Sequence, residues 1–350
     1  MTYTVTIEPS RHEFTVDTGE SILDAALRHG LVIPYSCRSG TCGTCMGKIV
    51  EGDVQYPGGQ PPASLDAKEI AIGQALFCQA RPDSDLVIEV REIREAGDIV
   101  PRRMRCRVAD MKRLCRDVMA LYLKLPDDAR LPFLPGQYID ILLRDGRRRS
   151  FSLANAPHDD ALLELQIRHI EGGEFSEHVF YTMQEKALLR MEGPFGTFHV
   201  RESDDRPILM MGGSTGIAPL KSMLLHLFHT DDSRPVHLYW GARSRQDLYL
   251  HEQLSAWAET QPRFRYTPCL SEPQRDDDWS GRIGLVHNML LQDYPDLSGY
   301  AVYMSGPPAM IAAAERDFAR HGVDHAHCFS DAFEFAADSH PDLTPAEPNE

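Results

Sequence analysis

Four cysteines restrict this chain more than any other feature of its sequence. Cys37, Cys42 and Cys45 follow the spacing C-x4-C-x2-C, and Cys78 lies 33 residues further along. Four thiolates at this spacing, the last from a distant segment, hold the two irons of a [2Fe–2S] cluster. A zinc site is the alternative, but zinc usually takes paired C-x2-C units. The pattern therefore predicts a protein that transfers single electrons.

Length and composition limit the remaining possibilities. The 350 residues are enough for two or three domains with proper cores. Neither a signal peptide nor an apolar run long enough to span a membrane is visible, and free thiols beside a cluster suit a reducing compartment, so we expect a cytoplasmic protein. The net charge of −16 argues against binding to nucleic acid or anionic membranes. The excess of acidic residues either reflects an ordinary solvated surface or steers the protein toward a basic patch on an electron acceptor.

Residues 1–93 have the pattern of a small α+β domain. Alternation over residues 3–7 and 13–16 predicts a hairpin, and Ser21 and Gly30 are placed to begin and end a short helix. After the cysteine loop we expect strands at residues 46–50 and 86–90. The whole segment resembles the β-grasp ferredoxin, with its mixed sheet and one helix.

The rest of the chain divides into two further domains and two polar segments. Residues 94–103 are charged and rich in arginine and indicate a linker. Residues 104–203 contain short strands separated by turns, which favours an antiparallel barrel. Residues 204–335 alternate apolar strands with helical patterns, as in an open parallel α/β sheet. Residues 336–350 hold three prolines and four acids, and we expect an acidic, disordered tail.

The barrel segment contains the sequence Arg149-Ser150-Phe151-Ser152. On a strand, Arg149 and Phe151 share one face and Ser152 turns to the other. The tetrapeptide resembles the Arg-x-Tyr-Ser/Thr flavin motif of the ferredoxin-NADP reductase superfamily. The resemblance implies that all four residues bind the flavin, with Arg149 on its phosphates, Phe151 packed on the ring and Ser152 near N5. Phenylalanine in place of tyrosine keeps the stacking and loses the phenol hydrogen bond.

A second flavin element follows at Gly172-Gly173-Glu174-Phe175-Ser176. A glycine-rich turn at a helix N-terminus suits a pyrophosphate. By the same resemblance, Ser176 and the amides around Gly173 hold the FAD pyrophosphate, and residues 193–198 match the turn that ends the family's barrel. Three motifs in family order favour FAD; FMN is the alternative.

The α/β segment opens with Gly213-Ser214-Thr215-Gly216-Ile217-Ala218-Pro219 after an apolar strand. A strand, a glycine-rich turn and a helix form a dinucleotide site at the carboxyl end of a parallel sheet. This segment resembles the family's Gly-Gly-Thr-Gly-x-x-Pro turn, with Ser214 at the second glycine. The resemblance implies nucleotide contacts from Gly213, Thr215 and Gly216, and a purely structural turn is the alternative.

Two later segments complete the predicted nicotinamide site. Ser305-Gly306-Pro307-Pro308 matches the family's Cys-Gly-Pro-Pro, which lies beside the nicotinamide C4, so Gly306 and Pro307 are implied to bind the cofactor. Ser305 replaces the usual cysteine, which suggests slower hydride transfer. Phe333 matches the aromatic ring that covers the second flavin face, although a core residue is the alternative. The implied catalytic set is Ser152, Ser305 and Phe333.

Charge bears on the choice of nicotinamide cofactor. Relatives that use NADPH commonly carry Ser-Arg after the third strand of this domain, whereas this chain has Ser271-Glu272. The Glu272 carboxylate repels a 2′-phosphate and can accept a hydrogen bond from a free ribose hydroxyl. NADH is therefore expected rather than NADPH, with nearby Arg275 as the contrary signal.

The three domains together imply an NADH-dependent iron–sulfur flavoprotein reductase that passes electrons from NADH through FAD and the cluster to a partner protein. Several segments are most similar to the CDP-6-deoxy-Δ3,4-glucoseen reductases of dideoxysugar synthesis: residues 136–140, 148–157, 220–223, 237–241 and 330–333. Residues 3–9 are equally similar to phenol hydroxylase reductases, and methane monooxygenase reductases also share this domain order. The implied partner is a sugar dehydratase or, alternatively, the oxygenase component of a mono- or dioxygenase. A redox sensor with an inactive nicotinamide site and a simple NADH:flavin reductase are the remaining hypotheses.

Overall fold

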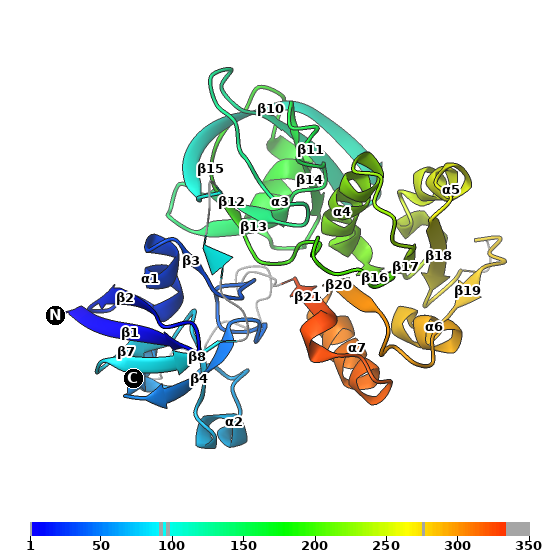
Figure 1. Cartoon of the computed structure of the whole chain (residues 1–350). Coiled ribbons are helices and arrows are strands. Elements are labelled where there is room, and N and C mark those ends of the chain that lie inside the picture. Colours follow the sequence, from blue (N-terminus) through cyan, green and yellow to red (C-terminus); the bar gives the residue numbers. More distant parts are fainter. Residues whose placement is uncertain (1, 91–93, 96–98, 275–276, 334–350) are drawn as a thin grey trace, which may run out of the picture. The chain divides into compact units, whose positions relative to one another are not determined.

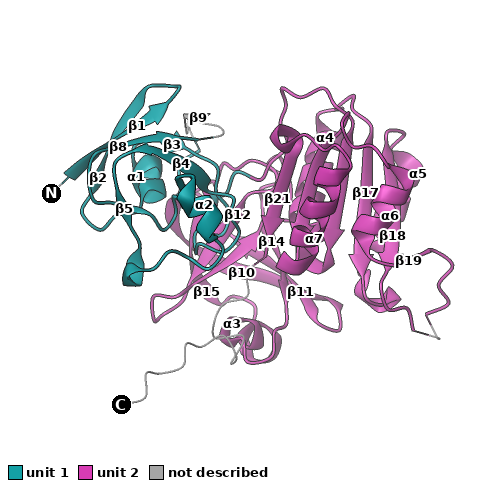
Figure 2. Cartoon of the chain, turned by 90° about the horizontal axis from the view of Figure 1, so that it is seen from below, with its two compact units in different colours: residues 1–101, 195–197 teal, residues 102–194, 198–350 magenta. Residues whose placement is uncertain are grey.

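The computed structural model describes residues 2–90, 94–95, 99–274 and 277–333 of the chain. The predicted tail at residues 336–350 and the contrary signal at Arg275 lie outside the described residues. The chain forms two compact units, residues 1–101 with 195–197 and residues 102–194 with 198–350 (Figure 2).

The first unit is built on a five-stranded mixed sheet (Figure 1). The spatial order is β2-β1-β8-β4-β6, with β1 parallel to β8 and all other pairs antiparallel. Val5, Ile7, Phe14 and Val16 are buried, and alternate residues of the same two strands are more exposed, as the sequence pattern predicts. The strands are β1 (Thr2–Glu8), β2 (His12–Asp17), β4 (Met46–Glu51), β6 (Gln74–Leu76) and β8 (Leu86–Glu89). The predicted hairpin and both later strands are confirmed.

One helix, α1 (Ile22–Arg28), packs on this sheet and buries Ile22 and Leu23. The Asp24 N–H donates to the Ser21 hydroxyl at 3.1 Å, which caps the helix as predicted. Gly30 ends it at a φ of 75°, a conformation that glycine adopts without steric cost. The shorter elements of the unit are β3 (Leu31–Val32), β5 (Val54–Gln55), η1 (Pro57–Gly59), α2 (Ala67–Ala71), β7 (Arg81–Pro82) and β9 (Arg94–Glu95).

The second unit begins with a six-stranded antiparallel sheet in the order β13-β12-β15-β10-β11-β14. A bridge between Leu153 and Leu165 joins the two outer strands and closes the barrel around an apolar core. The sheet starts at Arg102, because Arg102 and Arg103 pair with Gly193 and Glu192, so the last two residues of the predicted linker belong to it. The strands are β10 (Arg102–Cys115), β11 (Val118–Lys124), β12 (Tyr138–Leu142), β13 (Arg148–Ser152), β14 (Leu163–Arg168) and β15 (Leu188–Phe195). The predicted domain boundaries stay predictions.

A parallel sheet in the order β19-β18-β17-β16-β20-β21 completes this unit. Its strands are β16 (Ile208–Gly213), β17 (Val236–Ala242), β18 (Phe264–Leu270), β19 (Arg282–Ile283), β20 (Ala301–Gly306) and β21 (Cys328–Ala332). Helices cover both faces, and each face has its own apolar core. They are α4 (Ile217–His229), α5 (His251–Thr260), α6 (Val286–Asp293) and α7 (Pro308–Arg320). The expected open α/β sheet is confirmed.

The strand order reverses between β16 and β20, because the chain leaves β16 toward β17 and returns on the other side as β20. Ligands of open parallel sheets bind at such a point, outside the carboxyl ends of the strands. In the part of the chain that the structure describes, no helix has the length and apolar character needed to cross a bilayer.

Candidate functional site

The four cysteines of the first unit converge as two thiol pairs. Cys37 pairs with Cys42, and Cys45 pairs with Cys78. The hydrogen bond with Cys42 lowers the pKa of Cys37, whereas the hydrogen bond with Cys45, together with burial, raises the pKa of Cys78. Among the described residues no three acidic, histidine or cysteine side chains meet around one point that could hold a single metal ion. Two thiols on each of two irons is the arrangement that a [2Fe–2S] cluster requires, and it disfavours the mononuclear zinc alternative.

The loop around these cysteines is shaped by glycine and by backbone donors. Gly40 has a φ of +88°, and a Cβ there would lie 2.8 Å from Cγ of Gln79. The Gln79 amide in turn donates to the Arg38 carbonyl at 2.9 Å. The Ser39 N–H points at the Cys37 sulfur at 3.4 Å, the kind of contact that tunes the potential of a bound cluster.

In the barrel, β13 divides the predicted flavin residues between its two faces. Ser150 donates to the Asp140 carboxylate at 2.6 Å, so its hydroxyl is occupied on the face opposite to Arg149. Phe151 packs against Phe175 with ring centroids 5.5 Å apart. Ser152 is 9% exposed, and its hydroxyl makes no hydrogen bond to a described residue. Arg149, Phe151 and Ser152 therefore fit a flavin, whereas the Ser150 side chain belongs to the barrel.

The second flavin element is a turn braced by its own serine. The Ser176 hydroxyl donates to the Gly173 carbonyl at 2.9 Å and lies 3.1 Å from both the N–H and the carbonyl of Ile170. The turn leads into α3 (Glu174–Glu177) and a wider helical turn, η2 (His178–Thr182). The Gly172 and Gly173 N–H groups are also engaged, by the Glu177 carboxylate at 2.9 Å and the Ile170 carbonyl at 3.0 Å. The N–H groups at the start of α3, rather than the Ser176 hydroxyl or the turn itself, are therefore the donors that remain for a phosphate.

The nicotinamide turn lies at the switch point of the parallel sheet. Gly213 ends β16, and η3 (Ser214–Gly216) leads directly into α4. A Cβ on Gly216 would lie 2.1 Å from the Ser305 carbonyl oxygen, so only glycine lets the turn approach β20 this closely. The structure thus brings Gly213, Thr215 and Gly216 together with Ser305 and Gly306, residues that are about 90 positions apart in the sequence.

Ser305 and Phe333 both lie at the carboxyl edge of the same sheet. The Ser305 side chain is fully buried, and its hydroxyl is without a hydrogen-bond partner among the described residues. Burying a hydroxyl without a hydrogen-bond partner costs about 1–3 kcal/mol of folding free energy, and such a cost is consistent with a group that binds a ligand. The Phe333 N–H donates to the Gly306 carbonyl at 2.9 Å, which places Phe333 immediately after β21 at this edge, and Pro307 begins the turn into α7.

Glu272 lies at the carboxyl end of β18, beside the end of β17. Its N–H donates to the Arg243 carbonyl at 2.9 Å, and its exposed carboxylate forms no ion pair within the described ranges. The carboxylate is therefore available to a ribose, at the edge of the sheet where the nucleotide turn also lies.

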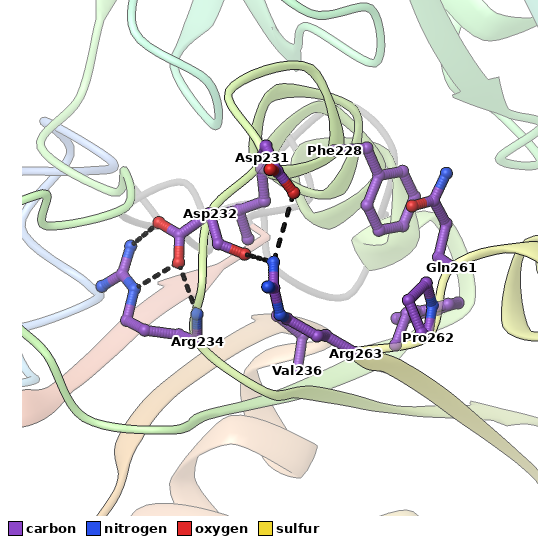
Figure 3. A pocket seen from close by; sticks show the side chains of 10 residues that line it. Phe228, Asp231, Asp232, Arg234, Val236, Gln261, Pro262 and Arg263 are labelled. Atoms are coloured by element: carbon purple, nitrogen blue, oxygen red, sulfur yellow. Dashed lines mark hydrogen bonds and ion pairs between the residues drawn. The ribbon is translucent and has the colours of Figure 1, made fainter.

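A small hollow at the opposite edge has a different character (Figure 3). It opens where β17 and β18 begin, at Val236 and Phe264. Its arginines are already engaged: Arg234 holds Asp232 with contacts of 2.6 and 2.9 Å, and Arg263 donates to Asp231 at 3.2 Å. The hollow lies away from the carboxyl ends of the strands, and we assign it no part in the chemistry.

Sequence reasoning missed the residues that join the barrel to the nicotinamide sheet. Lys221 of α4 reaches the Glu164 carboxylate of β14 at 2.6 Å, and the Ser222 hydroxyl donates to the Asn155 carbonyl at 2.6 Å. Arg168 of β14 donates to the Ser214 hydroxyl. A lysine inside an apolar helix face is the one sequence signal that could have indicated the first contact.

A ferredoxin fold with two thiol pairs, a barrel that carries the flavin motif on β13 and a parallel sheet with a nucleotide turn define an NAD(P)H-dependent iron–sulfur flavoprotein reductase. Family models agree in the same order along the chain. Residues 5–83 match the 2Fe-2S iron-sulfur cluster binding domain, residues 105–200 the oxidoreductase FAD-binding domain and residues 210–316 the oxidoreductase NAD-binding domain.

Relatives match along nearly the whole of this chain. The chain is 39% identical to the CDP-6-deoxy-L-threo-D-glycero-4-hexulose-3-dehydrase reductase of Yersinia pestis, over 95% of this chain and 99% of that protein. It is 34% identical to the reductase component of phenol 2-monooxygenase from Pseudomonas sp., over 97% and 96%. A solved cytochrome P450 reductase from Amycolatopsis superposes with a TM-score of 0.80 at 32% identity, over 95% and 98%. The chain belongs to this family of iron–sulfur flavoprotein reductases, as the sequence resemblance predicts.

Proposed function

We propose that the protein takes two electrons from NADH and delivers them one at a time to a partner protein. Bound FAD supplies this conversion, because it accepts a hydride and can release single electrons, and a [2Fe–2S] cluster carries one electron at a time. The two thiol pairs and the nucleotide turn beside Ser305 support the proposal. The chain's own residues would hold these groups.

We propose individual roles from the sequence resemblance, and the surroundings of the side chains support them. Arg149 would be the cation for the flavin phosphates and Phe151 would supply a ring against the flavin. The Ser152 hydroxyl, which makes no hydrogen bond to a described residue, would donate near N5. Ser305, whose hydroxyl has no hydrogen-bond partner among the described residues, would contact the nicotinamide, and Phe333 would occupy the nicotinamide position until the dinucleotide enters. These assignments agree with the burial and hydrogen bonding of each residue.

We further propose that NADH is preferred over NADPH, because Glu272 presents an exposed carboxylate at the carboxyl end of β18, with no ion pair to another described residue. Glu272→Gln removes the charge without changing the size of the side chain. We expect the ratio of kcat/KM for NADH to that for NADPH to fall about tenfold, the effect of about 1.4 kcal/mol of lost repulsion. Arg265→Gln is the control, because it also removes one charge from β18 but at the opposite end of the strand from Glu272. An unchanged ratio in Glu272→Gln would show that Glu272 does not select the cofactor.

The partner we propose is a dehydrase that acts on a CDP-6-deoxyhexulose. The observation that carries this proposal is the 39% identity to the reductase of that system over nearly the whole of both chains. An oxygenase component is the second candidate, supported by 34% identity to the phenol 2-monooxygenase reductase.

The two candidates are separated by a turnover experiment, run without oxygen for the dehydrase and with oxygen for the hydroxylase. The holoprotein and NADH are mixed with the purified 3-dehydrase and its CDP-sugar substrate, and NADH oxidation at 340 nm and sugar product are followed. A parallel sample contains the hydroxylase component of phenol 2-monooxygenase, phenol and oxygen. Dehydrase-dependent product supports the first candidate. Product only in the phenol sample reverses the ranking, and Cys78→Ser controls for electron transfer that bypasses the cluster.

A further inference from the structure

Ser214 is the residue of the nucleotide turn that departs from the family pattern, and its backbone is unusual. It adopts a φ of +53°, in the left-handed region that glycine enters without cost and serine does not. The related turns described above carry glycine at this position. The chain therefore holds a side chain in a strained conformation at the centre of its nucleotide site.

Neighbouring strands confine this turn on two sides. Gly216 approaches β20 so closely that an added Cβ would lie 2.1 Å from the Ser305 carbonyl oxygen. On the opposite side, the Trp240 indole N–H of β17 donates to the Ser214 carbonyl at 2.9 Å. These two contacts confine Gly216 and the Ser214 carbonyl, but neither of them involves the Ser214 side chain.

The hydroxyl meets Arg168, which comes from the flavin barrel. The guanidinium donates to the Ser214 hydroxyl and is held by the Asp117 carboxylate at 2.8 Å. Asp117 also accepts from the Cys115 thiol at 3.3 Å. Both members of the ion pair are mostly buried, with side-chain exposures of 32% for Arg168 and 20% for Asp117. The guanidinium therefore has a fixed position beside the turn.

We propose that Arg168 is a positioning residue for the pyridine dinucleotide. It ties the barrel that carries the flavin to the turn that receives the pyrophosphate, and it holds Ser214 in the left-handed conformation that leaves the turn's N–H groups open to phosphate. Because glycine adopts that conformation unaided, the need for Arg168 exists only while residue 214 is serine. The inference rests on the proposed role of this turn in binding the dinucleotide.

The test is a double-mutant cycle in the full-length holoprotein, with variants Arg168→Met, Ser214→Gly and both together. NADH oxidation is measured with ferricyanide as acceptor, and flavin content confirms that the barrel is intact. We expect Arg168→Met to raise the KM for NADH about tenfold, the equivalent of about 1.4 kcal/mol, with a much smaller change in kcat. In the Ser214→Gly background the same substitution should change KM less than about twofold. Arg130→Met, which removes a barrel arginine paired with Asp160, is the matched control and should leave KM unchanged.

A second measurement does not depend on NADH. In protein labelled with 5-fluorotryptophan, the ¹⁹F resonance of Trp240, assigned with Trp240→Phe, reports on the turn through its bond to Ser214. Arg168→Met should shift this resonance in the serine background and not in the Ser214→Gly background. Equal KM effects in both backgrounds would mean that Arg168 contacts the dinucleotide directly, and no effect in either would mean that it positions nothing; both results overturn the proposal. If the wild type does not oxidise NADH, the proposed function fails, and the ¹⁹F comparison still decides whether Arg168 positions the turn.

Discussion

Gly216→Ala is the substitution whose cost the structure defines most directly. Gly216 has a φ of −59°, which alanine adopts freely, so no backbone strain enters the comparison. The new Cβ, however, would lie 2.1 Å from the Ser305 carbonyl oxygen and 2.5 Å from the Ser305 carbonyl carbon. Both are backbone atoms of β20, a strand paired on both sides, and neither can turn aside as the end of a flexible side chain could.

The contact can be relieved only if the turn and the end of β20 move apart. Overpacking of this kind typically costs 1–3 kcal/mol, and the contact with backbone on one side favours the upper half of that range, about 2–3 kcal/mol. For a unit of this size, about 2 kcal/mol lowers Tm by about 4–8 °C. The same movement separates the nucleotide turn from Ser305, so we also expect hydride transfer from NADH to slow about tenfold or more.

Thermal unfolding followed by tryptophan fluorescence, and flavin reduction by NADH in an anaerobic stopped-flow instrument, measure the two effects. Gly299→Ala is the matched control, because a Cβ at Gly299 meets nothing within 4 Å. A Gly216→Ala protein that unfolds within 1 °C of this control and reduces its flavin at the wild-type rate would refute the reasoning.

Three further predictions concern the cluster, a buried ion pair and a buried histidine. Cys78→Ser removes one of the four ligands, so we expect NADH-dependent ferricyanide reduction to persist while reduction of the protein partner is lost. Lys221→Met leaves Glu164 as an uncompensated buried charge and should cost about 3–5 kcal/mol in the free energy of unfolding, most of which the double variant Lys221→Met/Glu164→Leu should restore. Burial, aided by Arg265, lowers the pKa of His237 to about 4 from an ordinary 6.5. Since the folded state favours the neutral ring, the contribution of His237 to stability is complete above pH 6.5 and is lost as the pH falls toward 4. Between pH 7.5 and 5.5 we expect the free energy of unfolding to fall by about 1 kcal/mol because of this residue. The fall is measured as a decrease in Tm, and His237→Gln should largely remove it.

Each of these predictions can fail in a specific way. Partner reduction that survives in Cys78→Ser would mean that electrons leave without passing through the cluster. A double variant no more stable than Lys221→Met would show that the cavity, and not the stranded carboxylate, causes the loss. Wild-type and His237→Gln curves of Tm against pH that run parallel would show that His237 does not titrate between its folded and unfolded values.

Much of the fold was predictable because its signals are local. Period-two alternation determined β1 and β2, and a serine and a glycine determined the ends of α1, since both effects act within a few residues. The full length of the longest strand, β10, is not visible in the local pattern, because its pairing with β11 has two register shifts that interrupt simple alternation. Arg94–Glu95, within the predicted linker, forms a short strand that pairs with β3. Local pattern does not reveal it, because its partner lies about 60 residues earlier in the sequence.

By itself, the sequence determined which chemical groups the protein can hold. Cysteine spacing selects a cluster and glycine-rich turns select phosphates, because those requirements are met by residue types at short separations. Only the tertiary structure decided which of those residues meet. It paired the thiols two and two, pressed Gly216 against Ser305, occupied the Ser150 and Ser176 hydroxyls within the barrel, and brought Arg168 to Ser214. These contacts join residues up to about 90 positions apart, and they depend on how strands of a closed barrel and an open sheet are ordered in space, which local sequence does not specify.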